Sequence, residues 1–291
     1  MHYSSLMLET LLFAYALLIL LLSAFTDIKK REVLDSASLT LLLISIITVI
    51  LYSLIQNNYN VLLTALKFFI LLLMFSLLLY YARQWGGGDT KLLIALSIPL
   101  TFPIIKFDIF LTSPIDFLVN LAIVGSLYGT FFALIKIMRR PKEFINNLKA
   151  ISKEHKYYLF LAVFFSLMIF IMANLQDINL IKSLLYSLSV FLLLIPILHT
   201  IFKSIESFSM IKTIPINRLT PGDWIIDKKI KSRFKISSLG IDQEQISLLK
   251  KAKIKLIQIK EGIPFVPTFL LAYVITNFYG NLIFNIIRVF I

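Results

Sequence analysis

The sequence predicts an all-α polytopic membrane protein with about eight transmembrane helices and a small cytosolic α/β subdomain. Three observations lead to this fold class. Of the 291 residues, 58% are hydrophobic and only 15% are charged, whereas average soluble domains carry about 25% charged residues. The apolar residues form blocks of about 20, which is the length of a helix that crosses a bilayer. The lysines and arginines are concentrated between alternate blocks.

Eight apolar runs are expected to span the membrane. In hydrocarbon every backbone polar group must be satisfied within its own segment, so runs of this length form helices rather than strands. The first run is expected to stay in the protein rather than to be a cleaved signal peptide, because the first five residues contain no Lys or Arg. The fourth run is the shortest. The expected spans are 6–25, 36–55, 61–81, 90–105, 117–138, 157–173, 183–202 and 263–279.

The basic residues predict the orientation in the cell membrane. Short loops rich in Lys and Arg stay on the cytoplasmic side, and 24 of the 29 basic residues fall between alternate spans. Both ends of the chain are then expected outside. The net charge of +13 suits contact with membrane lipids, and no nucleic-acid motif accompanies it, so no nucleic-acid partner is expected. The inner segments are 26–35, 82–91, 139–156 and 203–262.

The inventory of metal-binding residues is too small for a zinc site. The chain has no cysteine and only three histidines, His2, His155 and His199, far apart in sequence. A Cys/His cluster needs more ligands at closer spacing, and neither later histidine has a serine in a G-x-S-x-G motif to pair with. The sequence therefore predicts no metal and no cofactor, and it disfavours zinc and serine hydrolases.

Three parts are expected along the chain: a transmembrane core at 1–202, a cytosolic subdomain at 203–262 and a final transmembrane segment at 263–291. In the subdomain, Pro221-Gly222 predicts a turn before a strand at 224–226. Asp242 and Gln245 have capping-box spacing, which predicts a helix to Lys251. The segment 255–260 is expected to be a second strand. Two interpretations remain open, namely a docking surface for a substrate or partner and a folded connector.

Two aspartates stand where polar residues meet the membrane, a place where such residues are costly and tend to be functional. Asp27 follows the first span, and Asp89 follows three glycines, Gly86, Gly87 and Gly88, at the start of the fourth. The expected topology brings both to the inner membrane surface. Two neighbouring carboxylates share a proton, so that one can take a proton from water while the other donates to a carbonyl. Alternatively, Asp89 is a helix N-cap and Asp27 a solvated flank residue.

The residues around both aspartates resemble a known family. The stretch Gly86-x-Gly88-Asp89-x-Lys91-Leu92-Leu93 is similar to the G-x-G-D-x-K-L-L signature of GxGD membrane aspartic proteases, specifically the prepilin and preflagellin (archaellin) peptidases. The stretch from Asp27 to Val33 resembles the first aspartate segment of that family, D-x-x-x-R-x-(I/V). The specific similarity covers about residues 20–100. Without cysteines, the chain looks more like archaeal members than like bacterial ones that carry a cysteine cluster.

The resemblance implies an aspartic endopeptidase that removes the basic leader of type IV pilin-like or archaellin precursors at the cytoplasmic face. It assigns Asp27 and Asp89 to catalysis, Gly86, Gly87 and Gly88 to the active-site loop, and Lys91 to tuning or orienting the pair. An equal alternative for Lys91 is contact with the lipid head groups. Two other functions stay open. A presenilin-type intramembrane GxGD protease would show a Tyr-Asp pair within a span, whereas Thr26 precedes Asp27. A non-catalytic transporter or scaffold is the other, although transporters tend to show repeated halves.

Overall fold

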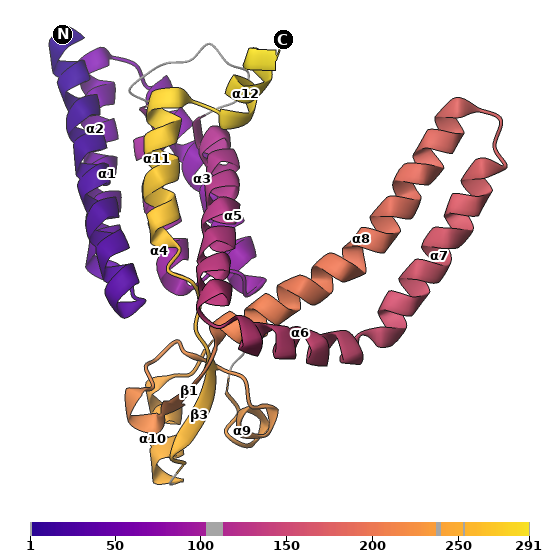
Figure 1. The fold of residues 1–291 in the computed structure, drawn as a ribbon. Coiled ribbons are helices and arrows are strands. Elements are labelled where there is room, and N and C mark those ends of the chain that lie inside the picture. Colours follow the sequence, from indigo (N-terminus) through magenta and orange to yellow (C-terminus); the bar gives the residue numbers. More distant parts are fainter. Residues whose placement is uncertain (1, 103–112, 237–239, 253, 291) are drawn as a thin grey trace.

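A computed structural model describes residues 2–102, 113–236, 240–252 and 254–290 (Figure 1). It is mostly helical with one three-stranded sheet, which confirms the predicted fold class. The helices are α1 (His2–Lys30), α2 (Asp35–Gln56), α3 (Asn60–Tyr81), α4 (Gly87–Leu96), η1 (Pro99–Thr101), α5 (Ser113–Arg139), α6 (Pro141–Glu154), α7 (Lys156–Asn174), α8 (Asn179–Met210), η2 (Ile216–Arg218), α9 (Lys228–Arg233), α10 (Gln243–Lys251), α11 (Val266–Tyr279) and α12 (Leu282–Phe290). The strands are β1 (Ile211–Pro215), β2 (Trp224–Ile225) and β3 (Leu256–Lys260).

Within the described residues, six helices are long and apolar enough to cross a membrane: α1, α2, α3, α5, α7 and α8. The pair α11 and α12, bent by 47°, makes a seventh span if it is counted as one. The count is therefore six or seven rather than the predicted eight. The difference is α4, whose 10 residues cover about 15 Å, half of the hydrocarbon thickness. The last three residues of the predicted fourth span, 103–105, lie outside the described residues.

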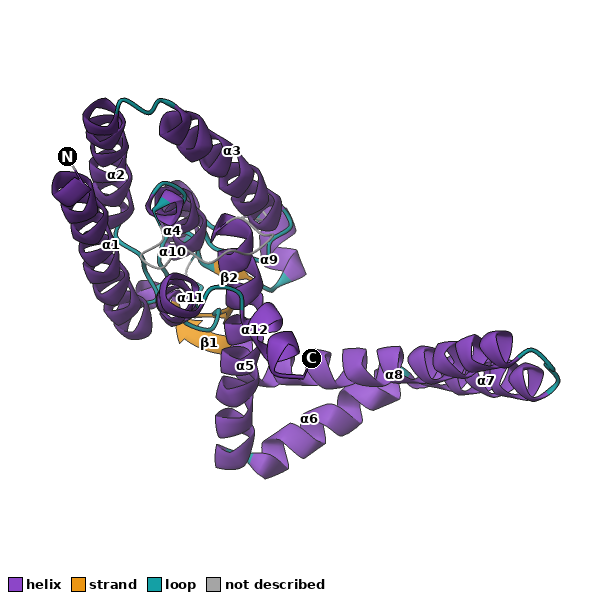
Figure 2. Cartoon of the chain, turned by 90° about the horizontal axis from the view of Figure 1, so that it is seen from above, coloured by secondary structure: helices purple, strands orange, loops and turns teal. Residues whose placement is uncertain are grey.

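The short helix α4 lies at the centre of the core. Seen from above, α1, α2, α3 and α11 surround it (Figure 2). Its side chains Leu92, Leu93 and Leu96 are fully buried. The helix α11, from the far end of the sequence, packs against α1 and α5. The start of α4 and the loop before it lie against the loop after α1 and the start of α11, at one end of the core that is below called the subdomain end.

A helical arm, α6 to α8, extends from the subdomain end of the core (Figure 1). The helix α6 joins α5 to α7 and packs against the lower part of α8, where Asn147 donates from Nδ2 to the Ser204 carbonyl and the Ser207 hydroxyl. The helices α7 and α8 form an antiparallel hairpin that stands apart from the core (Figure 1). The large side chains along the hairpin are exposed, as expected for helices that face lipid.

The subdomain contains the sheet, with strand order β1-β3-β2 and both pairs antiparallel. The predicted capping box at Asp242 and Gln245 is present, and the helix that it starts ends at Lys251 as predicted. The strands also match the predicted ones closely, at 224–225 and 256–260. The helix α8 runs directly into β1, and β3 leads into α11 through residues 261–265. The subdomain is therefore connected to the membrane helices at both of its ends.

Candidate active site

Asp27 lies in the last turn of α1, with its side chain turned into the protein and 8% exposed. Its carboxylate oxygen Oδ2 accepts a hydrogen bond of 2.9 Å from the backbone N–H of Val266, the first residue of α11. The N–H of Phe265 donates to the same carboxylate. The helix α1 ends just afterwards, because Arg31 takes a left-handed conformation with φ of 60°. Asp27, which is expected at the end of a span, thus accepts a hydrogen bond from the start of a helix 239 residues further along the chain.

Asp89 is the third residue of α4, so it is not the N-cap. That position belongs to Gly86, which is extended at φ −75° and ψ 163° and has no side chain to cap the helix. The Asp89 carboxylate instead accepts a hydrogen bond from the Gly86 N–H. Thr90 binds the other side of the same residue, with its N–H and its hydroxyl donating to the Gly86 carbonyl. These bonds fix the first turn of α4 and the direction of the Asp89 side chain.

The two carboxyl groups lie close enough to interact electrostatically. Burial, followed by the negative charge of Asp27, raises the pKa of Asp89 to about 7, and the hydrogen bond from the Gly86 N–H acts in the opposite direction. At neutral pH the Asp89 carboxyl is therefore protonated far more often than a solvated aspartate. Carboxyl groups whose charges act on one another in this way titrate as a pair.

Side-chain packing holds the two aspartate segments together. A Cβ on Gly88 would lie 2.9 Å from Cβ of Val33, in the loop after α1, so only glycine fits there. On the other side, Trp85 packs against the rings of Phe265 and Phe269 of the α11 segment, with centroids 6.0 and 5.4 Å away. The loop that carries Asp89 is thus wedged between the end of α1 and the start of α11.

The other predicted loop residues have different surroundings. None of the three glycines has a positive φ, so the steric need for glycine is confined to Gly88. A Cβ on Gly86 or Gly87 would make only ordinary contacts, at 3.7 and 3.9 Å. Lys91 forms an ion pair of 2.6 Å with Asp35, the first residue of α2. Because both side chains are more than half exposed, this pair contributes at most about 1 kcal/mol.

Sequence reasoning assigned no role in the site to three groups near the pair, although Arg31 belongs to the D-x-x-x-R motif. The charge of Arg31 acts on Asp27, and its Nη1 atom is buried without a hydrogen-bond partner in the described part of the chain. The charges of Arg31 and Asp27 both act on the Tyr128 hydroxyl group of α5. The N–H of Val266 is the third group. Pro267 directly after it is a sequence signal for a helix start, but nothing local indicates which side chain that start would bind.

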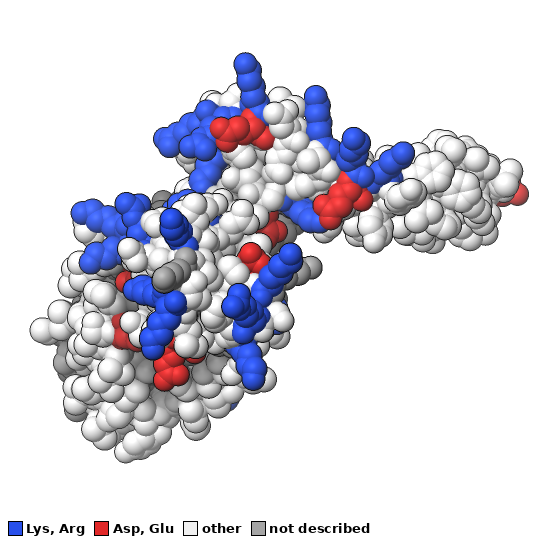
Figure 3. Space-filling view, turned by 90° about the horizontal axis from the view of Figure 1, so that it is seen from below, with Lys and Arg blue, Asp and Glu red and all other residues white. Residues whose placement is uncertain are grey.

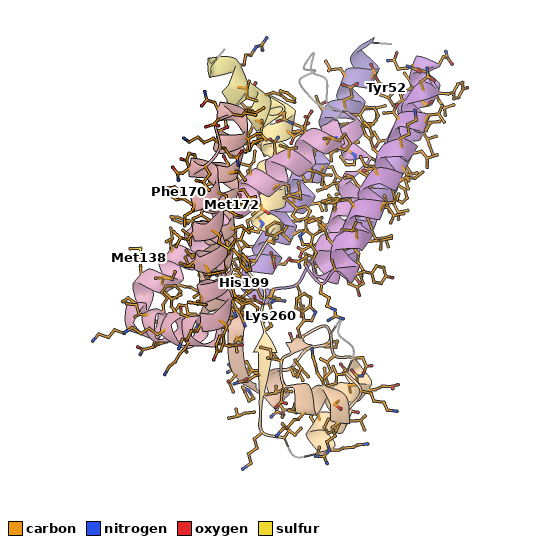
Figure 4. All side chains as sticks on the ribbon, turned by 90° about the vertical axis from the view of Figure 1, so that its right-hand side faces the viewer. Tyr52, Met138, Phe170, Met172, His199 and Lys260 are labelled. Carbon is orange, nitrogen blue, oxygen red and sulfur yellow. The ribbon has the colours of Figure 1, made fainter. Side chains whose placement is uncertain are left out.

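A pocket of about 610 Å³ lies elsewhere, at the base of the arm. His155 is buried there, with Nδ1 3.1 Å from the Thr200 hydroxyl and Nε2 3.0 Å from Lys203 Nζ, and His199 stacks on it at 5.2 Å (Figure 4). No serine lines the pocket among the residues that the structure describes. Within the same described residues, no three His, Cys, Asp or Glu side chains lie together in a way that could hold a metal ion.

The acids of the subdomain mainly stabilise its own turns. Asp227 accepts from the N–H groups of Lys229 and Ile230, and Asp242 forms the capping box. Asp223 accepts from the N–H and the hydroxyl of Thr220. Burial raises the pKa of Asp223, the Thr220 hydrogen bonds lower it, and the nearby charges of Glu261 and Glu32 raise it. Since Glu32 belongs to the loop after α1, this part of the subdomain lies close to the aspartate segments.

Comparison with known proteins gives one finding. The model of the type IV leader peptidase family matches residues 14–134, a segment that contains both Asp27 and Asp89 and ends before the arm. No curated protein and no solved structure matches the chain significantly. Residues 14–134, less than half of the chain, are therefore similar to the type IV leader peptidases, which are aspartic-type enzymes that cleave prepilin-like leader peptides, and this segment carries both aspartates and several of the candidate membrane spans.

Proposed function

We propose that the chain is a leader peptidase and that Asp27 and Asp89 are its catalytic pair. The observation that carries the proposal is that the charge of Asp27 acts on the buried carboxyl group of Asp89, although 62 positions separate the two residues in sequence (89 − 27). The pair can divide the work of amide hydrolysis. The ionised carboxylate takes a proton from water while the neutral carboxyl group donates a hydrogen bond to the peptide carbonyl. The leaving amine then takes up a proton, and the pair returns to its singly protonated state.

The proposed substrates are type IV pilin-like precursors, including archaellins, whose short basic leader is cut on the cytoplasmic side. The side follows from charge. Seen from below, the face that bears the subdomain carries many Lys and Arg side chains (Figure 3). The aspartate pair belongs to this end of the core, since Asp27 lies in the last turn of α1 and Asp89 in the first turn of α4. An excess of basic residues keeps loops cytoplasmic, and a precursor whose apolar helix stays in the bilayer presents its leader at this depth.

The test is leader cleavage by the full-length chain in membranes. The probe is a co-expressed precursor with a basic leader, a glycine at the cut and an apolar helix, and the mature N-terminus is read by mass spectrometry. Asp27→Asn and Asp89→Asn should each lower the rate by at least about 10³-fold without lowering the amount of protein. The matched control is Asp177→Asn, the same chemical change at an exposed residue in the loop between α7 and α8, which should cleave at the wild-type rate.

The same assay separates the alternatives. A presenilin-type protease would cut within the apolar helix, which changes the mass of the product, and a transporter or scaffold would yield no product. Retained cleavage in both single variants would reject the aspartate pair. Addition of EDTA should leave the rate unchanged, because the proposed pair activates water by proton transfer; inhibition by EDTA would indicate a metal.

A further inference from the structure

We propose that the first turn of α11 is a third component of the active site, which holds Asp27 in its ionised form and so makes Asp27 the base and Asp89 the proton donor. This inference rests on the proposed catalytic pair and deepens it by assigning the two roles. It also extends the site beyond residues 14–134, because α11 begins at Val266.

The hydrogen bond from Val266 is the first part of the argument. The first N–H groups of a helix have no partner within the helix, and they carry partial positive charge. In α11 the Val266 N–H points at Oδ2 of Asp27 from 2.9 Å, while Pro267 has no N–H to offer. A backbone donor aimed at a carboxylate favours the anion, and such charge-assisted bonds are the stronger class.

The surroundings of the two carboxyl groups also favour the ionised form at Asp27 over the ionised form at Asp89. Asp27 receives the N–H groups of Val266 and Phe265 and the positive charge of Arg31. Asp89 receives a backbone N–H from Gly86 alone. The charged or titratable groups that face Asp27 from neighbouring elements are Arg31 after α1, Asp89 from α4 and Tyr128 from α5. Burial desolvates both carboxyl groups, but Asp27 has several donors and a positive charge beside it whereas Asp89 has the Gly86 N–H. This difference decides which of the two groups holds the proton.

The position of the α11 turn is set by packing. The ring of Phe265 lies between Trp85 and Gly125 of α5, and a Cβ on Gly125 would come within 2.8 Å of Cζ of Phe265. Below the turn, β3 ends at Lys260, which pairs with Glu206 at the end of α8 (Figure 4). The next residue, Glu261, pairs with Lys212 of β1 and donates its N–H to the Met210 carbonyl. The subdomain thus anchors the segment that leads to the donor.

The decisive experiment removes the N–H. Val266→Pro deletes the donor at the first position of the helix, where the missing N–H breaks no bond within α11, although a proline there also disfavours the conformation of Phe265, at φ −101° and ψ −20°. Val266→Ala loses the same methyl groups but keeps the N–H. We expect kcat for leader cleavage by Val266→Pro to be about 10- to 100-fold below that of Val266→Ala, the usual effect of a hydrogen bond to a charged group. The acidic limb of the pH–rate profile should move up by about one unit, with the alkaline limb unmoved.

Equal rates and superimposable pH profiles for the two variants would overturn the inference. The catalytic pair would stand in that case, because it depends on the Asn variants of Asp27 and Asp89. If Val266→Pro does not accumulate in membranes, Gly125→Val provides the second test, since it displaces the Phe265 ring without touching either aspartate. Gly125→Val should lose rate and shift the acidic limb, and adding Phe265→Leu, which restores the space, should recover both. A loss of rate without the pH shift, or without recovery, would show a merely structural role.

Discussion

The core and the arm are built from similarly apolar helices, but the core helices bury more of their residues within the protein. In the most apolar 18 residues of α2, 28% of the positions are buried within the protein, whereas in α8 the share is 11%. The buried positions of α2 are mostly small, with Ser38, Ser45 and Ser53 on the packed face, while large side chains such as Leu39 and Ile47 face outward. In lipid, large apolar residues gain nothing by leaving the surface, and small residues allow helices to approach. Apolar composition therefore predicts which segments span the membrane, and small polar residues indicate which face of a span packs against its neighbours.

The largest expected difference between the two regions is in stability. Phe117 of α5 is fully buried in the core and packs on Phe269, so Phe117→Ala should cost about 3–5 kcal/mol. Phe160 of α7 is 67% exposed, and Phe160→Ala should cost less than about 0.5 kcal/mol. Thermal unfolding of the purified variants in lipid nanodiscs measures both. Similar losses for the two would mean that the arm packs against another protein surface.

A smaller effect is expected within the aspartate loop. Gly88→Ala places a Cβ 2.9 Å from Val33, which should cost about 1–3 kcal/mol through overpacking and lower the cleavage rate by moving Asp89. Gly87→Ala meets Tyr80 only at 3.9 Å and should have the smaller effect on both measurements. Adding Val33→Ala should restore the Gly88→Ala protein in part. If Gly87→Ala is the more damaging variant, the packing of the loop is not as described.

The smallest expected effect is a pH dependence of stability. Asp89, in a helix too short to be a span, has its pKa raised from 3.8 to about 7 in the folded protein. The folded state then holds more protons than the unfolded state, so the stability from this group is complete below about pH 4 and is lost as pH rises toward 7. Asp89→Asn removes the titrating group and stays neutral throughout.

The measurement is the Tm of Asp89→Asn relative to wild type at pH 6 and pH 8. Between these pH values the Tm of wild type should fall by about 2–4 °C relative to the Tm of the variant. A change near 1 kcal/mol in the free energy of unfolding has this effect in a chain of this size. Asp177→Asn, the exposed change in the arm, controls for loss of one charge and should show no such trend. A relative rise of wild type with pH would mean that Asp89 is stabilised as the anion.

The sequence by itself determined the membrane class, the approximate positions of seven spans and most of the subdomain. These features depend on local patterns: apolar length, the distribution of Lys and Arg, and the spacing of Asp242 and Gln245. It also singled out Asp27 and Asp89, because a polar residue at a span end is conspicuous among apolar neighbours. It could not show that the fourth run breaks after 10 residues, since Leu92 and Leu93 look the same whether lipid or protein surrounds them.

Only the tertiary structure decided which distant groups complete the site. The bond from Val266 to Asp27 joins residues 239 positions apart, and nothing in either segment specifies the other. The sequence also could not predict that Lys91 forms an ion pair with Asp35 rather than with the aspartate pair, because the partner of an exposed charge depends on which groups are near it in the folded protein. Local sequence sets the conformation of a segment, whereas the partner of a buried carboxylate depends on how the helices pack, which is a property of all of them together.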